Sequence, residues 1–197
     1  MEALARMRSL IRRTVSGSVR AVLALVVGAL VAVSCSGEAR PGEPYAEDFE
    51  RAQKQAVSDF EKQVLADRKI TRTEYDEAVR QYVSCMKARG LGLEAVDSGY
   101  GYYTYVETPT SPNHDAAHVV CRRGTTFLIE TLYTGIVTNP NNVDVDDLRA
   151  ACFVRKGLAP KGYSGESSKA DGRRGYEGAP FDREDPRFQQ CLANPSR

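Results

Sequence analysis

Residues 21–34 form a run of 14 amino acids without a charged side chain, and this run sets the strongest limit on the chain's architecture. A helix of that length is about 21 Å long, whereas the hydrocarbon core of a bilayer is about 30 Å thick. Residues 6–20 before the run are rich in arginine, and Ser34 and Cys35 end it. A basic segment followed by a short apolar segment and a small residue is typical of a signal peptide. We therefore predict that residues 1–34 are removed on export.

The end of the run, Ala32-Val33-Ser34-Cys35, resembles the lipobox of bacterial lipoprotein precursors. In that family a diacylglyceryl group is attached to the cysteine sulfur, and a peptidase cleaves just before the cysteine. Ser34 fits the small position before the cut, whereas Ala32 stands where the family usually has leucine. The resemblance implies that acyl chains such as palmitate on Cys35 hold the protein at the outer face of the cytoplasmic membrane. Plain secretion and an uncleaved single-span anchor are the alternatives.

Lipidation of Cys35 would leave four of the five cysteines in the exported chain. An even number of cysteines in an oxidising compartment predicts two disulfides. We expect the pairs Cys85–Cys121 and Cys152–Cys191, because cysteines that are neighbours in sequence close the smallest loops. Zinc ligation by these cysteines is disfavoured, because the sequence has no C-x₂-C pair.

The charge distribution argues against a nucleic-acid partner. The whole chain has 27 basic and 26 acidic side chains. Five arginines and one glutamate lie in residues 1–34, so 22 basic and 25 acidic side chains remain after cleavage. A mildly acidic body lacks the basic patch with which proteins bind phosphate backbones. Residues 35–45 are rich in Pro, Gly and charge and are predicted to be a flexible tether.

Apolar residues recur at helical spacing through much of residues 46–197, which we expect to form one small domain. Thr71 and Glu74 form a capping-box pattern at the start of one helix. The expected helices cover residues 46–66, 72–89, 114–137 and 144–156, with a short one after Asp185-Pro186. In residues 114–137 we expect a buried face made of Val119, Val120, Phe127, Leu128, Leu132 and Ile136, with Cys121 among them. Residues 160–184 are polar and glycine-rich and are predicted to be a long loop.

Residues 91–107 change from a helical to a strand-like pattern around a turn at residues 98–101, which predicts a β-hairpin. The expected fold class is therefore mainly α (α+β), with four to five helices, one hairpin and two disulfides. If the second segment is a strand, Tyr103 and Tyr105 share one face and Tyr102 points to the other. Exposed tyrosines can stack on sugar rings of a cell wall or contact a protein partner. Strand propensity and core packing are the alternative explanation.

No pattern in the sequence indicates catalysis, a metal or a cofactor. His114 and His118 have the i, i+4 spacing that can bind zinc, but no third ligand is evident, so we interpret them as surface histidines. Ser164 lies in a G-Y-S-G segment that lacks the G-x-S-x-G pattern of a nucleophile elbow. Residues 139–147 are rich in oxygen atoms but lack the Gly and Glu of an EF-hand loop. We therefore expect no enzyme, no cofactor and no metal.

Several short motifs are shared with small secreted or lipid-anchored proteins of actinobacteria, whose function is not known, and the chain resembles that group. These motifs are Glu74-Tyr75-x-x-Ala78, Tyr82-x-x-Cys85-Met86, the C-x₄-G-L segments at Cys85 and Cys152, and Cys191-x-x-Asn194-Pro195. The resemblance implies no activity. We expect a cell-surface lipoprotein that binds or scaffolds a cell-wall or protein partner at the envelope, with Tyr102, Tyr103 and Tyr105 as the binding surface. An envelope hydrolase and a small-ligand-binding lipoprotein are the alternatives.

Overall fold

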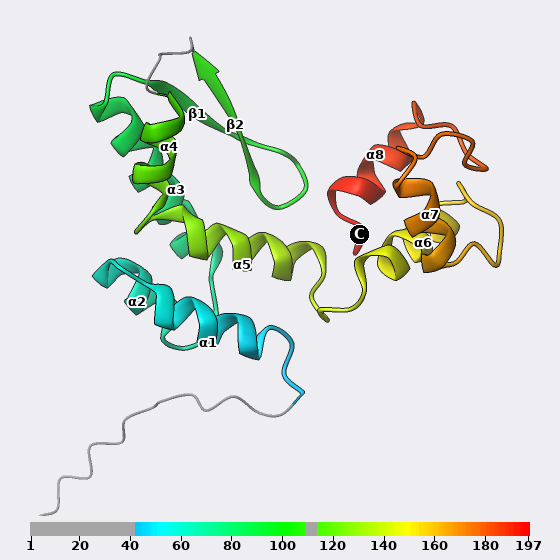
Figure 1. Ribbon diagram of the computed structural model, residues 1–197, viewed down its shortest axis with the longest axis horizontal. Helices are drawn as coiled ribbons and strands as arrows, with labels where there is room; N and C mark the ends of the chain where they lie inside the picture. The colour runs from blue at the N-terminus through cyan, green and yellow to red at the C-terminus, as the bar shows by residue number, and fades with distance from the viewer. Residues whose placement is uncertain (1–41, 109–113) are drawn as a thin grey trace, which may run out of the picture. The chain divides into compact units, whose positions relative to one another are not determined.

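The structure is a computed structural model and describes residues 42–108 and 114–197. In these residues the chain forms eight helices and one two-stranded antiparallel sheet (Figure 1), which confirms the expected mainly helical α+β class. The helices are α1 Ala46–Gln55, α2 Asp59–Leu65, α3 Arg72–Ala88, α4 His114–Arg122, α5 Thr126–Thr138, α6 Val145–Arg155, α7 Gly165–Gly172 and α8 Pro186–Ala193. The strands are β1 Gly92–Asp97 and β2 Tyr103–Thr108. Within the ranges described, no helix has both the length and the apolar character needed to cross a bilayer.

The segment expected as one helix over residues 46–66 is two helices. Ser58 begins the second one, α2, with a capping box in which its hydroxyl accepts a hydrogen bond from the backbone N–H of Glu61. The Glu61 carboxylate accepts in return from the N–H groups of Val57 and Ser58. The Ser58 hydroxyl also donates to the carbonyl of Gly124, 2.7 Å away. A new helix therefore starts here because the side chains satisfy its free N–H groups.

The segment expected as one helix over residues 114–137 is likewise broken, at Gly124. This residue has φ +84°, a left-handed conformation that favours glycine, and it separates α4 from α5. The break changes which side chains face inward. The expected buried face was wrong at Val119, Val120 and Phe127, which are 71%, 51% and 53% exposed. It was correct at Cys121, Leu128 and Leu132, which are buried, and the buried face of α5 also includes Ile129 and Tyr133.

The prediction of a long loop over residues 160–184 was wrong, because this segment contains helix α7. Ser164 caps this helix, its hydroxyl accepting from the N–H of Ser167 at 3.2 Å. The helix lies against α6 and buries polar side chains, among them Asp171, whose carboxylate accepts from the Tyr163 hydroxyl at 2.8 Å. A short helix whose buried face is polar has no apolar periodicity, so the sequence pattern did not indicate it.

Two disulfides join the helices in the predicted pairs. Cys85–Cys121 connects α3 to α4, and Cys152–Cys191 connects α6 to α8, with Cα–Cα distances of 5.5 and 5.7 Å. The second disulfide lies beside an aromatic cluster in which the buried Phe153 contacts the rings of Tyr163, Tyr176, Phe181 and Phe188. Each disulfide therefore closes a separate part of the hydrophobic core.

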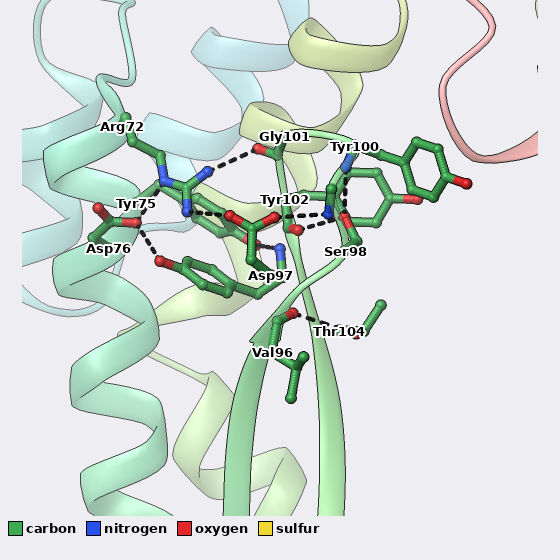
Figure 2. Close-up of polar contacts among 12 residues, drawn as sticks. Arg72, Tyr75, Asp76, Val96, Asp97, Ser98, Tyr100, Gly101, Tyr102 and Thr104 are labelled. Atoms are coloured by element: carbon green, nitrogen blue, oxygen red, sulfur yellow. Dashed lines mark hydrogen bonds and ion pairs between the residues drawn. The ribbon is translucent and has the colours of Figure 1, made fainter. Parts of the chain in front are cut away.

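Helix α3 holds the hairpin and packs against β1, α4 and α5. It begins with the predicted capping box, in which the Thr71 hydroxyl accepts from the N–H of Glu74. Arg72, the first residue of α3, binds the hairpin turn (Figure 2). Its guanidinium donates to the carbonyl of Gly101 at 3.3 Å and forms ion pairs with Asp76 and Asp97. These contacts hold the turn that precedes β2 against the first turn of α3.

Candidate functional site

A cleft of about 640 Å³ is lined by side chains from α3, the hairpin, α4, α5 and the end of α8. Four of its lining residues are Tyr82, Tyr102, Tyr103 and Tyr105. The last three are the residues that the sequence singled out as a binding surface, and the structure brings all three to this one cleft. A volume of about 300–1,000 Å³ is typical of sites that bind small molecules.

The Tyr105 side chain is held by a hydrogen bond to Glu130 of α5. The Tyr105 hydroxyl donates to Glu130 Oε1 at 2.8 Å, and the buried Tyr75 donates to the same oxygen at 3.0 Å. Arg122 Nη2 lies 3.7 Å from the other carboxylate oxygen of Glu130. Burial, more than any other effect, raises the pKa of both tyrosines, so their hydroxyls stay protonated as hydrogen-bond donors.

Tyr103 is fixed at the start of β2 by contacts with α3. Its backbone N–H donates to the Tyr75 hydroxyl at 3.1 Å, and its own hydroxyl donates to Asp76 at 3.1 Å. The Arg72 guanidinium lies 4.6 Å from the centre of the Tyr103 ring, within the range of a cation–π interaction. Tyr103 therefore has little freedom to move, and its position in the cleft wall is set by helix α3.

Tyr102 lies outside the strand alternation that the sequence suggested. Strand β2 begins at Tyr103, so Tyr102 belongs to the turn (Figure 2), and it lines the same cleft as Tyr103 and Tyr105. Its hydroxyl donates to the backbone carbonyl of Ala193 at 3.2 Å. The neighbouring Tyr100 is also in the turn but does not line this cleft. The hydroxyls of all three predicted binding tyrosines therefore donate hydrogen bonds to other groups of the chain, and their rings are what they can offer a ligand.

Polar side chains complete the cleft on the side of α5. Thr131, Thr134 and Thr138 follow one another along its lining, and each hydroxyl donates to the carbonyl four residues earlier. Their oxygens keep lone pairs that can accept hydrogen bonds from a ligand. Glu107, Glu130, Arg122 and His118 add charged and titratable groups to the same lining. The cleft therefore combines aromatic rings with both acceptors and donors.

The two histidines form a cluster with Glu107, and Glu107 and His118 of this cluster line the cleft. The Nε2 atoms of His114 and His118 are 2.9 Å apart, and His118 Nε2 is 2.8 Å from Glu107 Oε1. His114 Nε2 is hydrogen-bonded to Glu107 Oε2, and this bond is the main cause that raises the pKa of His114. The Tyr82 hydroxyl is hydrogen-bonded to His118 Nδ1 on the other side of the ring. The interpretation as two separate surface histidines misses this cluster.

Other residues singled out from the sequence have structural positions. The hydroxyl of Ser164 caps helix α7, and Asp144 caps α6 by accepting from the N–H groups of Asp146 and Asp147. The four cysteines of the domain form disulfides. The predicted signal peptide and Cys35, with the tether as far as residue 41, lie outside the described residues.

Sequence reasoning missed Glu107, Arg122 and Glu130 as members of the site. A signal for Glu107 was available, because it stands two residues after Tyr105 in the same strand and so lies on the same face. Arg122 and Glu130 gave no such signal, because they come from helices whose relative placement depends on the break at Gly124. Comparisons with family models, curated proteins and solved structures found no match for this chain.

Proposed function

We propose that the protein is a lipid-anchored binding protein of the cell envelope and that its tyrosine-lined cleft holds a saccharide segment. The observation that carries this proposal is the meeting of Tyr102, Tyr103 and Tyr105 with hydroxyl and carboxylate acceptors around one cavity. An envelope protein exported with the predicted signal peptide would face polymers rich in sugar. The proposal concerns binding and requires no catalytic step.

The chemistry of the lining supports a sugar as the ligand. A sugar ring presents C–H groups on its faces, which pack on aromatic rings, and hydroxyls at its edges, which need hydrogen-bond partners. The cleft offers tyrosine rings, and it offers acceptor oxygens on Thr131, Thr134 and Glu107. Because Tyr103 and Tyr105 are already held by Asp76 and Glu130, the lining is arranged before a ligand arrives. A preorganised site loses less conformational entropy on binding.

The test of the cleft requires variants that alter it without removing core contacts. All three tyrosines of the lining pack against the hydrophobic core, so the main variant is Thr131→Trp, which fills the cavity from an exposed position. Tyr102→Ala, which removes part of the wall at the turn, is compared only as a folded protein. Tyr100→Ala is the matched control, because Tyr100 is in the same turn and outside the cleft. Each protein would be purified as the full chain in detergent and checked for folding by circular dichroism.

Binding would be measured by sedimentation with purified cell-wall polymer and by calorimetry with soluble N-acetylglucosamine oligosaccharides. We expect the unaltered protein and Tyr100→Ala to bind alike, and Tyr102→Ala and Thr131→Trp to bind about tenfold or more weakly, the equivalent of about 1.4 kcal/mol. If the unaltered protein binds neither polymer nor oligosaccharide, or if folded Thr131→Trp binds as well as the control, the saccharide proposal is wrong.

The anchoring part of the proposal rests on the lipobox resemblance at Cys35 and has a separate test. In Cys35→Ala, neither lipid attachment nor the associated cleavage would take place. We expect mass spectrometry of the native protein to find a lipid on Cys35 at the new N-terminus. Native membrane-bound protein with an intact Met1 or a free thiol at position 35 would contradict the anchor while leaving the proposal for the cleft untouched.

A further inference from the structure

The cluster of Glu107, His114 and His118 has the composition and the spacing of a metal site. One ligand atom from each residue lies within 4.8 Å of the other two. His114 Nε2 is hydrogen-bonded to Glu107 Oε2, and His118 Nε2 lies 2.8 Å from Glu107 Oε1 and 2.9 Å from His114 Nε2. Three side chains from a strand and a helix therefore aim their ligand atoms at a common point.

These separations are close to those that a bound ion needs. Zinc holds imidazole nitrogen and carboxylate oxygen at about 2.0–2.2 Å in tetrahedral geometry, which places the ligand atoms about 3.3–3.5 Å apart. The observed distances of 2.8 and 2.9 Å are shorter by a few tenths of an ångström, and the His114–Glu107 contact is shorter still. The side chains of Glu107, His114 and His118 would rotate outward to make room for the ion. The i, i+4 spacing on α4 keeps both rings on one face of the helix.

Contacts on the far side of each imidazole ring orient it for this role. His118 Nδ1 is hydrogen-bonded to the Tyr82 hydroxyl, and His114 Nδ1 lies 3.3 Å from a carboxylate oxygen of Asp115. Partners of this kind accept a hydrogen bond from the Nδ1–H of a histidine, so that the proton stays on Nδ1 and the lone pair of Nε2 can ligate a metal. Both Nε2 atoms are the ones that point at Glu107. Tyr82 is itself buried, at 2% exposed, so it gives His118 a fixed support.

We propose that Glu107, His114 and His118 bind one divalent transition-metal ion of the zinc class. Two imidazole nitrogens and one carboxylate oxygen suit ions of this class rather than Mg²⁺ or Ca²⁺, which prefer oxygen ligands alone. Three protein ligands leave a fourth position to water or to a ligand in the adjacent cleft. The proposal does not depend on the saccharide proposal, because it rests on the distances among these three residues alone.

The test measures binding of Zn²⁺ itself to the full chain, purified in detergent without a polyhistidine tag and treated with a chelator. Calorimetry should show one Zn²⁺ per chain, and Co²⁺ added in its place should give the intense visible absorption of a four-coordinate site. His114→Ala and Glu107→Gln should each abolish stoichiometric binding. Neither variant removes a buried apolar side chain, so both should fold. Glu94→Gln, a change of another exposed carboxylate on the same hairpin, is the matched control and should bind as the unaltered chain does.

Tyr82→Phe tests the positioning of His118 separately, because it keeps the ring in the core and removes the hydroxyl. Loss of a partner of this kind weakens metal binding by about 10–100-fold. A purely structural role would lower thermal stability and leave the affinity for Zn²⁺ unchanged. Zn²⁺ binding equal in His114→Ala and the unaltered chain, or no binding by the unaltered chain, would overturn the metal site. Thr131→Trp fills the cleft but leaves the three metal ligands in place, so it should bind Zn²⁺ as the unaltered chain does. The saccharide proposal can therefore fail while Zn²⁺ binding is unchanged, and the two proposals are tested separately.

Discussion

The two hydroxyls that converge on Glu130 give the most direct quantitative test of the structure. Tyr105→Phe keeps the ring, which packs edge-on against Tyr82 at 5.2 Å, and removes only the bond to Glu130 Oε1. A hydrogen bond to a charged group contributes about 1.5–3 kcal/mol. We therefore expect the free energy of unfolding to fall by about 1.5–3 kcal/mol in Tyr105→Phe.

Tyr75→Phe should cost more, because its hydroxyl serves two partners. It donates to Glu130 at 3.0 Å and accepts from the N–H of Tyr103 at 3.1 Å, so the change also leaves that N–H without its acceptor. We expect a loss larger than that of Tyr105→Phe by about 1 kcal/mol. Tyr100→Phe is the matched control, because the hydroxyl of Tyr100 has no hydrogen-bond partner among residues 42–108 and 114–197, and its effect should stay within about 0.5 kcal/mol.

Urea denaturation followed by far-ultraviolet circular dichroism would measure these changes. A double-mutant cycle between Tyr105→Phe and Glu130→Gln would isolate the coupling between the two side chains, which should be at least about 0.5 kcal/mol. Two results would refute the reasoning: a loss in Tyr105→Phe no larger than that of the Tyr100→Phe control, or a larger loss in Tyr105→Phe than in Tyr75→Phe.

Three further predictions concern pH, a disulfide and the C-terminus. Burial raises the pKa of Tyr82 to about 12, so its share of stability is fully present below the unfolded value of about 10 and is lost as pH rises from about 10 to about 12. Urea titrations across that range should show a shallower decline for Tyr82→Phe. Replacing Cys152 and Cys191 with alanine should lower the free energy of unfolding by about 2–4 kcal/mol in urea. Asn194→Ala removes donors to the carbonyls of Tyr100 and Val137, and calorimetry should show a loss of about 1–3 kcal/mol.

Features that depend on neighbours in sequence could be predicted without the fold. The capping box at Thr71, the hairpin and the start of a short helix at Asp185 all follow from local backbone and side-chain chemistry. Ser58 and Glu61 form a second capping box of the same S/T-x-x-E form, so the break between α1 and α2 was also available from the sequence.

The candidate site was only partly predictable, because its members come from separate elements. The sequence indicated three tyrosines and a pair of histidines with helical spacing, and it could not supply the third ligand. Glu107 belongs to strand β2 and not to the helix of the histidines, and it joins them because its side chain reaches those of His114 and His118 on α4. Glu130 enters the same cleft from α5 because α3 packs against both that helix and the hairpin.

The sequence by itself indicated the helix that begins after Thr71, the short helix after Asp185, the hairpin and the pairing of the cysteines. Each of these depends on a spacing along the chain, which the sequence records directly. The tertiary structure decided which tyrosine faces meet, where Glu107 and Glu130 lie, and that Val119 and Phe127 remain exposed. These outcomes depend on how α4 and α5 turn at Gly124, and a side chain's surroundings after such a turn are set by packing between distant segments.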